Sequence, residues 1–142
     1  MTIQVKRLAI ARVVYDALLR AARAASPLEA CGLLAGHDDR VVQFYPLANA
    51  DASPEHFSML PAEQFAAVKD MRRRGLRLLA IWHSHPASPA RMSAEDLRLA
   101  FTPDVAYVIL SLVTPDAPVL GGYALRDGAA EPMPILIEGQ PS

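Results

Sequence analysis

The segment IWHSHPASPARMSAEDL, residues 81–97, contains the side chains of this sequence that are best suited to chemistry. His83 and His85 follow a hydrophobic run that predicts a strand. Alternate residues of a strand project from the same face, so both imidazoles can reach one ion. Two polar residues leaving a strand into solvent would produce the same pattern. The pair therefore indicates a metal site only together with other ligands.

Ser93 and Asp96 follow in the same segment and begin a predicted helix. Ser93 suits the N-cap, and acidic residues suit the first helical turn, so the S-x-x-D pattern by itself predicts only a capped helix. A carboxylate in the first turn is also held rigidly and points back toward the loop that carries the histidines. Two histidines and one carboxylate fill three positions of a catalytic zinc site and leave the fourth for water.

Glu29 is the candidate proton shuttle that such a hydrolytic site needs. It lies in PLEACGLLAG, where a helix exit meets an apolar strand. A glutamate there is costly to bury unless it is paired or has a chemical role. The alternative is a carboxylate exposed at the start of the strand.

These residues together resemble the JAMM (MPN+) metalloprotease family. The resemblance lies in P-x-E-x-C-G-L-L-x-G, followed by H-S-H-P and, after seven residues, by S-x-x-D. It extends to Pro46, Leu47 and Asn49 and covers most of the chain. Each part is weak alone, but the combined spacing is specific. The compact size of the chain resembles the prokaryotic members of the family.

The resemblance implies a role for each residue of the pattern. His83, His85 and Asp96 would bind Zn²⁺, and Glu29 would activate water and pass its proton to the leaving amine. Ser93 would stabilise the tetrahedral intermediate by donating a hydrogen bond. Every position holds the expected residue type, which argues against the metal-free scaffolding members of the family. The implied fold is a single α/β domain, 1–142, with a JAMM/MPN-like (cytidine-deaminase-like) mixed sheet sandwiched by helices.

The resemblance also implies a substrate class. The family cleaves amide and isopeptide bonds after the C-terminal tails of ubiquitin-like proteins, and compact prokaryotic members are linked to sulfur carriers that end in Gly-Gly. We therefore expect a peptidase or isopeptidase acting on such a carrier or on a similar small conjugate. One alternative is a zinc-stabilised binding module that holds a ubiquitin-fold carrier without turnover. Another is a small-molecule zinc amidase.

Composition excludes several other classes of partner. The 142 residues are 52% hydrophobic and carry a net charge of −1, which predicts one globular domain without electrostatic attraction to nucleic acid. The longest apolar runs are too short to span a membrane. Cys31 is the single cysteine, so an intramolecular disulfide is impossible and a cytoplasmic location is expected. The oligomeric state is left open.

Hydrophobic periodicity predicts the elements that must position these residues. Two helices are expected, at 12–25 and from Pro61 to Gly75, with Phe65, Val68 and Met71 on one face of the second. A third begins at Ser93. Strands are expected at 3–8, 30–36, 41–47, 56–60, 76–83, 105–113, 119–125 and 133–138. From the residues alone, this order fits an α/β or an α+β sandwich.

The neighbours of the motif on the strands receive structural interpretations. Ser84 should face away from the metal and be hydrogen-bonded, and Trp82 should pack in the core. Cys31 is expected to be a small buried side chain, with a redox-sensitive zinc ligand as the alternative.

The loops leave more open. Asn49 would either bind the substrate backbone or hold its own loop. His37 and His56 lie in turn-like contexts and are assigned to no site. Met92 could line the substrate groove, and Arg91 is interpreted as a solvated loop charge, with contact to a substrate carboxylate as the alternative.

Overall fold

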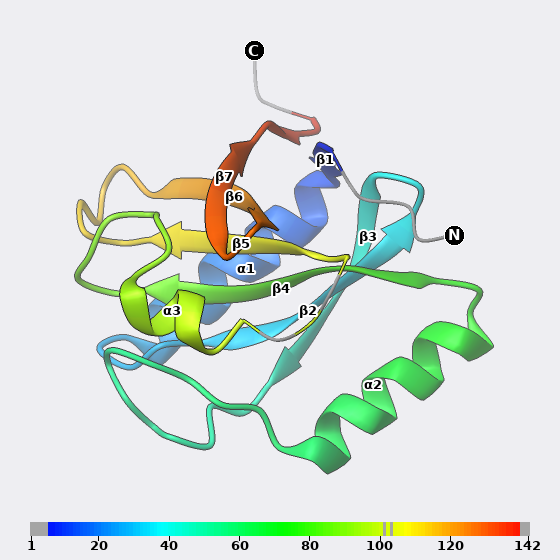
Figure 1. Ribbon diagram of the computed structural model, residues 1–142, viewed down its shortest axis with the longest axis horizontal. Helices are drawn as coiled ribbons and strands as arrows, with labels where there is room; N and C mark the ends of the chain where they lie inside the picture. The colour runs from blue at the N-terminus through cyan, green and yellow to red at the C-terminus, as the bar shows by residue number, and fades with distance from the viewer. Residues whose placement is uncertain (1–5, 101, 103, 140–142) are drawn as a thin grey trace.

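The computed structural model describes residues 6–100, 102 and 104–139 (Figure 1). The elements of that part of the chain are β1 (Leu8–Ile10), α1 (Arg12–Ala25), β2 (Cys31–His37), β3 (Arg40–Leu47), α2 (Pro61–Arg73), β4 (Arg77–His85), α3 (Ala94–Arg98), β5 (Ala106–Ser111), β6 (Val119–Arg126), β7 (Ala129–Met133) and β8 (Ile135–Ile137).

All eight strands described belong to one mixed sheet, in the order β7, β6, β5, β4, β2, β3, β1, β8. β4 runs parallel to β5 and antiparallel to β2, and β1 runs parallel to β3 and β8. In Figure 1, α1 passes behind this sheet, while α3 lies in front of the end where β4 terminates. Helices thus cover both faces, and the expected mixed sheet between helices is confirmed.

The helix at 12–25 has the predicted bounds because its apolar positions repeat with helical spacing. Val14, Leu18 and Ala22 are buried on one side of α1. They pack in a core that includes Trp82 and Leu110 from the rear face of β4 and β5. Trp82 is fully buried there, as expected. This core occupies the face of the sheet opposite to the histidines.

Local signals also set the ends of α2 and the turn between β2 and β3. Pro61 begins α2 at the N1 or N2 position, and Gly75 follows its C-cap with φ of +70°, a conformation that glycine adopts without strain. β2 and β3 form the predicted antiparallel hairpin around the HDDR turn. The boundaries of these elements therefore follow from ordinary sequence signals.

Three predictions about elements need correction. Residues 56–60 form no strand, because no neighbouring strand pairs with them. The short strand β7 was missed, since its sequence AAEPM carries little β-propensity. The expected first strand is β1 at Leu8–Ile10, and residues 3–5 lie outside the described part of the chain.

The predicted apolar face of α2 is confirmed at Met71 and wrong at Phe65. Phe65 is 68% exposed, whereas Ala67 and Met71 are buried against Ile81 and Tyr107. Phe65 and Met71 are six residues apart, which places them on different sides of a helix with 3.6 residues per turn. The helix docks through Met71 and leaves the phenylalanine outside.

No helix in the described part of the chain is long and apolar enough to cross a membrane.

The docking side of α2 can be tested by two truncations. We expect Met71→Ala to lower the free energy of unfolding by about 2–5 kcal/mol, because it leaves a cavity in the core. Phe65→Ala on the same helix should change it by less than about 1 kcal/mol, since its ring is mostly in water. Urea unfolding followed by circular dichroism measures both. Equal effects of the two substitutions would contradict this orientation of the helix.

Candidate metal centre

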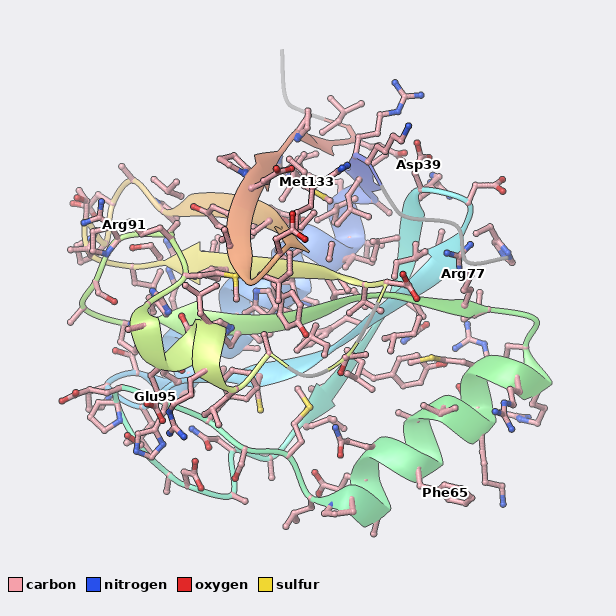
Figure 2. The ribbon with its side chains drawn as sticks, viewed as in Figure 1. Asp39, Phe65, Arg77, Arg91, Glu95 and Met133 are labelled. Atoms are coloured by element: carbon pink, nitrogen blue, oxygen red, sulfur yellow. The ribbon has the colours of Figure 1, made fainter. Side chains whose placement is uncertain are left out.

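The two histidines lie near the end of the central strand β4. His83 and His85 are 1% and 3% exposed, so they do not leave the strand into solvent. β5 flanks β4 on one side, and on the other Cys31 of β2 pairs with His83. α3 lies over the same end of the sheet, which Arg91 and Glu95 mark in Figure 2, with Arg77 at the opposite end of β4. The histidines are therefore enclosed between the sheet and α3.

Asp96 meets both histidines from the first turn of α3. Ser93 is the N-cap, and a complete capping box joins it to Asp96: each backbone N–H donates to the other residue's side chain at 3.0 Å. Asp96 Oδ1 lies 3.2 Å from His83 Nε2, and Asp96 Oδ2 lies 3.0 Å from His85 Nε2. The two Nε2 atoms are 3.0 Å apart. Helix capping and the carboxylate–imidazole cluster thus coexist.

The spacing of these groups fits a tetrahedral ion. Ligand atoms at about 2.0–2.1 Å from zinc in a tetrahedron lie roughly 3.3 Å from one another. Three separations of 3.0–3.2 Å between two imidazole nitrogens and a carboxylate are close to that value. Imidazole nitrogen and carboxylate oxygen are also ligand types that zinc accepts. His83, His85 and Asp96 are therefore candidate ligands for such an ion.

The protonation states of these groups favour a cation. Burial lowers the pKa of His83, which keeps its imidazole neutral and able to coordinate. Burial alone would raise the pKa of Asp96, but its contacts with both imidazoles and the hydrogen bond from the Ser93 N–H hold that pKa well below its ordinary value. Burial also lowers the pKa of His85, but its hydrogen bonds to Asp96 and to the Pro89 carbonyl outweigh burial and raise that pKa. The cluster thus presents a carboxylate beside the neutral imidazole of His83.

His85 is oriented through its second ring nitrogen. Its Nδ1 lies 2.8 Å from the carbonyl oxygen of Pro89. A carbonyl only accepts, so Nδ1 carries the hydrogen and Nε2 is left to face Asp96 and His83. Such a contact fixes the tautomer and the ring plane of a ligating histidine.

Glu29 stands beside the histidines and outside the tight triangle. Carboxylate and ring atoms of Glu29, His83 and His85 lie within 4.8 Å of one another. Glu29 is 3% exposed, and its Oε1 has no hydrogen-bond partner within the described part of the chain. The Ser84 hydroxyl fixes the residue that follows Glu29, since it accepts the Ala30 N–H at 2.8 Å. Ser84 therefore faces away from the histidines and is hydrogen-bonded, as expected.

Burial raises the pKa of Glu29 from 4.5 to about 8. The positive charge of His85 opposes this change, while Asp96 and Glu55 add to it. A carboxyl group with a pKa near neutrality can both take and release a proton, which is what a proton shuttle requires.

This arrangement agrees with a match to known proteins. A family profile described as prokaryotic homologs of the JAB domain matches residues 11–120, which is more than half of the chain. The chain belongs to this family. The matched range contains Glu29, both histidines, Ser93 and Asp96, so the whole cluster lies inside the JAB domain.

Individual relatives extend the match over most of the chain. The CysO-cysteine peptidase of Mycobacterium tuberculosis is 34% identical over 129 residues, which cover 89% of this chain and 88% of that protein. The desampylase of Haloferax volcanii is 32% identical over 112 residues, covering 74% of this chain and 81% of its own. The resemblance to the JAMM family is thereby confirmed.

Solved structures confirm the fold. The solution structure of a Desulfitobacterium hafniense protein is 47% identical, covers 94% of each chain and has a TM-score of 0.86. A JAB1/MPN domain protein from Archaeoglobus fulgidus is 23% identical, covers 92% of this chain and 98% of its own, and has a TM-score of 0.58. At that identity the second likeness concerns the fold alone.

Two residues beside the cluster of this JAB domain, His56 and Phe57, had no assigned place in the site. The Phe57 ring stacks on His83 with centroids 4.7 Å apart and an interplanar angle of 28°. His56 lines the crevice beside His83, and its Nδ1 lies 2.9 Å from Asp51. Both come from a loop without regular spacing, so the sequence carries no signal for their proximity.

The contacts of Asn49 support the interpretation that it holds its own loop. Its amide nitrogen donates to the carbonyls of Glu29 and His56 at 3.1 and 3.0 Å. Its amide oxygen accepts the N–H groups of Asp51 and Ser58 at 3.0 and 3.3 Å. All of these contacts lie within the chain, so Asn49 ties the loop to the backbone of Glu29.

Cys31 is a buried thiol, 2% exposed. Its sulfur contacts the carbonyls of Leu47 and Ala48 at 3.6 Å, and burial raises its pKa to about 12. A thiol with that pKa is protonated at neutral pH and is a poor ligand, which favours the packing role over the redox-sensitive ligand.

A hydrophobic groove leads to the cluster. It has a volume of about 270 Å³ and includes Phe57, Leu99 and Tyr107 in its lining. The same three side chains line the narrower crevice beside His83 and Asp96, to which Met92 also contributes, as expected.

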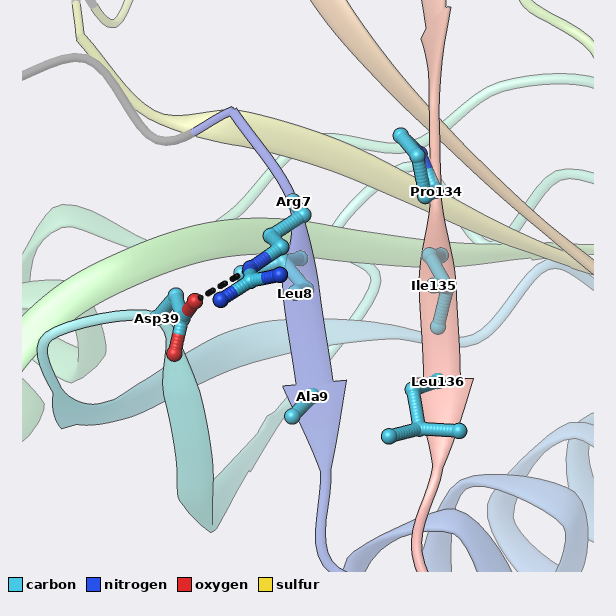
Figure 3. A pocket seen from close by; sticks show the side chains of 7 residues that line it. All are labelled: Arg7, Leu8, Ala9, Asp39, Pro134, Ile135 and Leu136. Atoms are coloured by element: carbon cyan, nitrogen blue, oxygen red, sulfur yellow. Dashed lines mark hydrogen bonds and ion pairs between the residues drawn. The ribbon is translucent and has the colours of Figure 1, made fainter.

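Another hollow, of about 370 Å³, is lined by residues of the paired strands β1 and β8 at the far edge of the sheet (Figure 3). The charged side chains in its lining are Arg7 and Asp39, which are paired at 3.0 Å. The groove of about 270 Å³ adjoins the crevice at His83 and Asp96 and is therefore the candidate substrate site.

The proposed ligand set can be tested by removing one member. We expect Asp96→Asn to weaken zinc binding by at least about 100-fold, because an amide is a poorer ligand than a carboxylate and even outer contacts of a ligand are worth 10–100-fold. Glu95→Gln, on the same turn, should leave zinc affinity unchanged. Competition with a chromogenic chelator measures both. Unchanged affinity in Asp96→Asn would remove Asp96 from the ligand set.

The burial of Glu29 makes a prediction about pH for the protein stripped of metal. A carboxyl group whose pKa is raised on folding contributes stability below pH 4.5, and this contribution is lost as the pH rises through 8. Glu29→Gln should therefore match wild type near pH 4 and exceed it by roughly 2–4 kcal/mol at pH 9. Denaturant unfolding in the presence of a chelator provides the comparison. A constant difference across this range would show that Glu29 does not titrate with a raised pKa.

Proposed function

We propose that this protein is a zinc metallopeptidase that hydrolyses the amide bond after the C-terminal Gly-Gly tail of a ubiquitin-like sulfur-carrier protein or of a similar small conjugate. The observation that carries the proposal is the buried Glu29 carboxylate beside the triangle of His83, His85 and Asp96. The peptidase name of the relative from M. tuberculosis supports both the reaction and the kind of substrate.

Each residue of the cluster has a proposed role. His83, His85 and Asp96 would hold the zinc ion, which when bound polarises the scissile carbonyl and lowers the pKa of a coordinated water toward about 7. Glu29 takes a proton from the attacking water and delivers it to the nitrogen of the leaving amine. Ser93 keeps its hydroxyl hydrogen while its oxygen accepts the Asp96 N–H, so it can donate to the developing oxyanion.

The segment before α2 supports binding of an extended tail. Ser58 directs its backbone N–H to Asn49 and its carbonyl to the Ala50 N–H. The flanking Phe57 and Met59 make no backbone hydrogen bond to any described residue, and both line the groove. An extended peptide can pair with such a free edge by β-augmentation. The free edge at Phe57 and Met59 belongs to the loop before α2. It is not an edge of the sheet, whose edge strands are β7 and β8.

The crevice beyond the groove supports a tail of small residues. It is about 20 Å³ in volume and is bounded by Phe57, His83, Met92 and Asp96 among others. Glycine brings its backbone close to surrounding atoms because it has no side chain. Gly-Gly at the end of a carrier fits this restriction.

We assign the activity to the single domain 1–142 and place it in the cytoplasm. The free thiol of Cys31 supports a reducing compartment.

The two other functions use the same site differently. A binding module without turnover has no need for a buried carboxylate like that of Glu29, whose Oε1 has no partner among the described residues. A small-molecule amidase has no need for the groove along Phe57 and Met59. Both features favour the carrier peptidase.

The proposed function can be tested with a ubiquitin-fold carrier extended by one cysteine beyond Gly-Gly. We expect zinc-loaded wild type to remove the cysteine and Glu29→Gln to be slower by at least about 100-fold, because the variant lacks the general base. Glu29→Gln should still bind one zinc per chain and the carrier. Mass spectrometry follows the cleavage, and Glu95→Gln is the matched control.

Other outcomes identify the other functions. Carrier binding without cleavage by wild type would indicate the binding module. Equal cleavage of the carrier and of a free Gly-Gly-Cys peptide would indicate the amidase. Full activity in Glu29→Gln would exclude Glu29 as the base.

A further inference from the structure

The loop at 86–92, between the second histidine and the Ser93 cap, is held by its carbonyl groups. Three consecutive carbonyls, those of Ser88, Pro89 and Ala90, each accept a hydrogen bond from a side chain of the sheet. The donors are Ser111 Oγ at 2.6 Å for the first and His85 Nδ1 at 2.8 Å for the second. The Tyr123 hydroxyl is the donor for the third.

The donors come from three adjacent strands and share one face of the sheet. His85 of β4 is paired in register with Ser111 of β5. Tyr107 lies four residues before Ser111 on β5 and is paired with Tyr123 of β6. Because residues an even number apart project from the same face, Ser111 and Tyr123 lie on the face that carries His85. The loop therefore crosses this face beside the metal centre.

Gly121 of β6 allows the loop at 86–92 to lie close against that strand. A Cβ atom at this position would lie 2.6 Å from the carbonyl oxygen of Ala90. That distance is too short for any side chain, so a glycine is needed for the carbonyl to approach the strand. Tyr123, two residues later on the same face, then donates to the same oxygen. Both features of β6 act on one atom of the loop.

The Pro89 carbonyl connects the loop at 86–92 to the candidate metal centre. Pro89 O accepts from His85 Nδ1, and this contact directs His85 Nε2 toward Asp96 and His83. Pro89 lies directly before Ala90 in the chain, so a shift of Ala90 moves the acceptor that orients the imidazole. Outer contacts of this kind typically change metal affinity 10–100-fold.

We propose that Tyr123, seated over Gly121, is a positioning residue of the metal centre: by fixing the Ala90 carbonyl it holds the Pro89 carbonyl that orients His85. The inference rests on the proposed function, because it assigns His85 as a zinc ligand. It concerns a residue 27 positions beyond the last of the proposed ligands, Asp96, on a different strand of the sheet.

The test removes one hydroxyl group in each of two variants. Tyr123→Phe deletes the donor to Ala90 and keeps the ring. The matched control is Tyr45→Phe, which deletes a hydroxyl that donates to Asp70 of α2 at 2.6 Å, away from the cluster. We expect zinc to bind about 10-fold more weakly to Tyr123→Phe and with wild-type affinity to Tyr45→Phe, as measured by chelator competition.

A spectroscopic measurement separates positioning from general destabilisation. With Co²⁺ in place of zinc, the visible absorption bands should shift in Tyr123→Phe and stay unchanged in Tyr45→Phe, because they report ligand geometry. Gly121→Ala, whose added Cβ would displace the Ala90 carbonyl, should shift them as well. Circular dichroism confirms that each variant is folded before the comparison.

The outcomes distinguish this inference from the proposed function. Wild-type zinc affinity and cobalt bands in Tyr123→Phe would overturn the positioning role and leave the peptidase proposal intact. Equal losses in Tyr123→Phe and Tyr45→Phe would also overturn it, since the effect would then be one of stability. Absence of zinc binding by wild type would overturn both.

Discussion

The structure depends on a buried contact between one carboxylate and two imidazoles. Asp96, His83 and His85 are each at most 7% exposed, and their polar atoms lie 3.0–3.2 Å apart. Removing such groups from water costs several kcal/mol unless each is paired. The central position of β4, the capped turn of α3 and the loop between them all serve to bring these groups together. A cation bound among them would offset much of this cost.

The sheet separates this polar cluster from the main source of stability. The core against α1 is built from fully apolar contacts such as Leu18, Trp82 and Leu110. The opposite face combines a smaller apolar cluster with the histidines and the groove. Because the two faces of a strand alternate, one element supplies both a stable core and a chemically active surface. The polar cluster on the active face is therefore supported by packing behind it.

The loop between β3 and α2 couples three parts of the proposed mechanism. Asn49 fixes it to the backbone of Glu29, Phe57 stacks on His83, and Met59 lines the groove. The proposed base, a proposed ligand and the proposed tail-binding edge thus share one short segment. A substrate that pairs with this segment would be positioned relative to the base and the metal at once.

Features that depend on neighbouring residues were predictable without the structure. The helix at 12–25, the cap at Ser93 and the Pro61 and Gly75 signals of α2 follow from local backbone chemistry. The spacing of Glu29, the two histidines and Asp96 was sufficient to indicate the cluster, because a family resemblance supported each weak motif. The same local rules do not report on pairing, which is why 56–60 was wrongly expected to be a strand.

Contacts between distant residues depend on the folded chain and carry no local signal. The exposure of Phe65 depends on which side of α2 docks, and the stacking of Phe57 on His83 depends on the path of a loop. Tyr123 lies 38 positions beyond His85 in the chain, yet the pairing of β4, β5 and β6 brings both to one loop. Sheet order and register are set by the sum of long-range contacts, for which a single sequence carries no periodic signal. The residue types of the site can therefore be predicted from the sequence. The residues that hold them in place, such as Phe57 and Tyr123, are identified only from the assembled sheet and its loops.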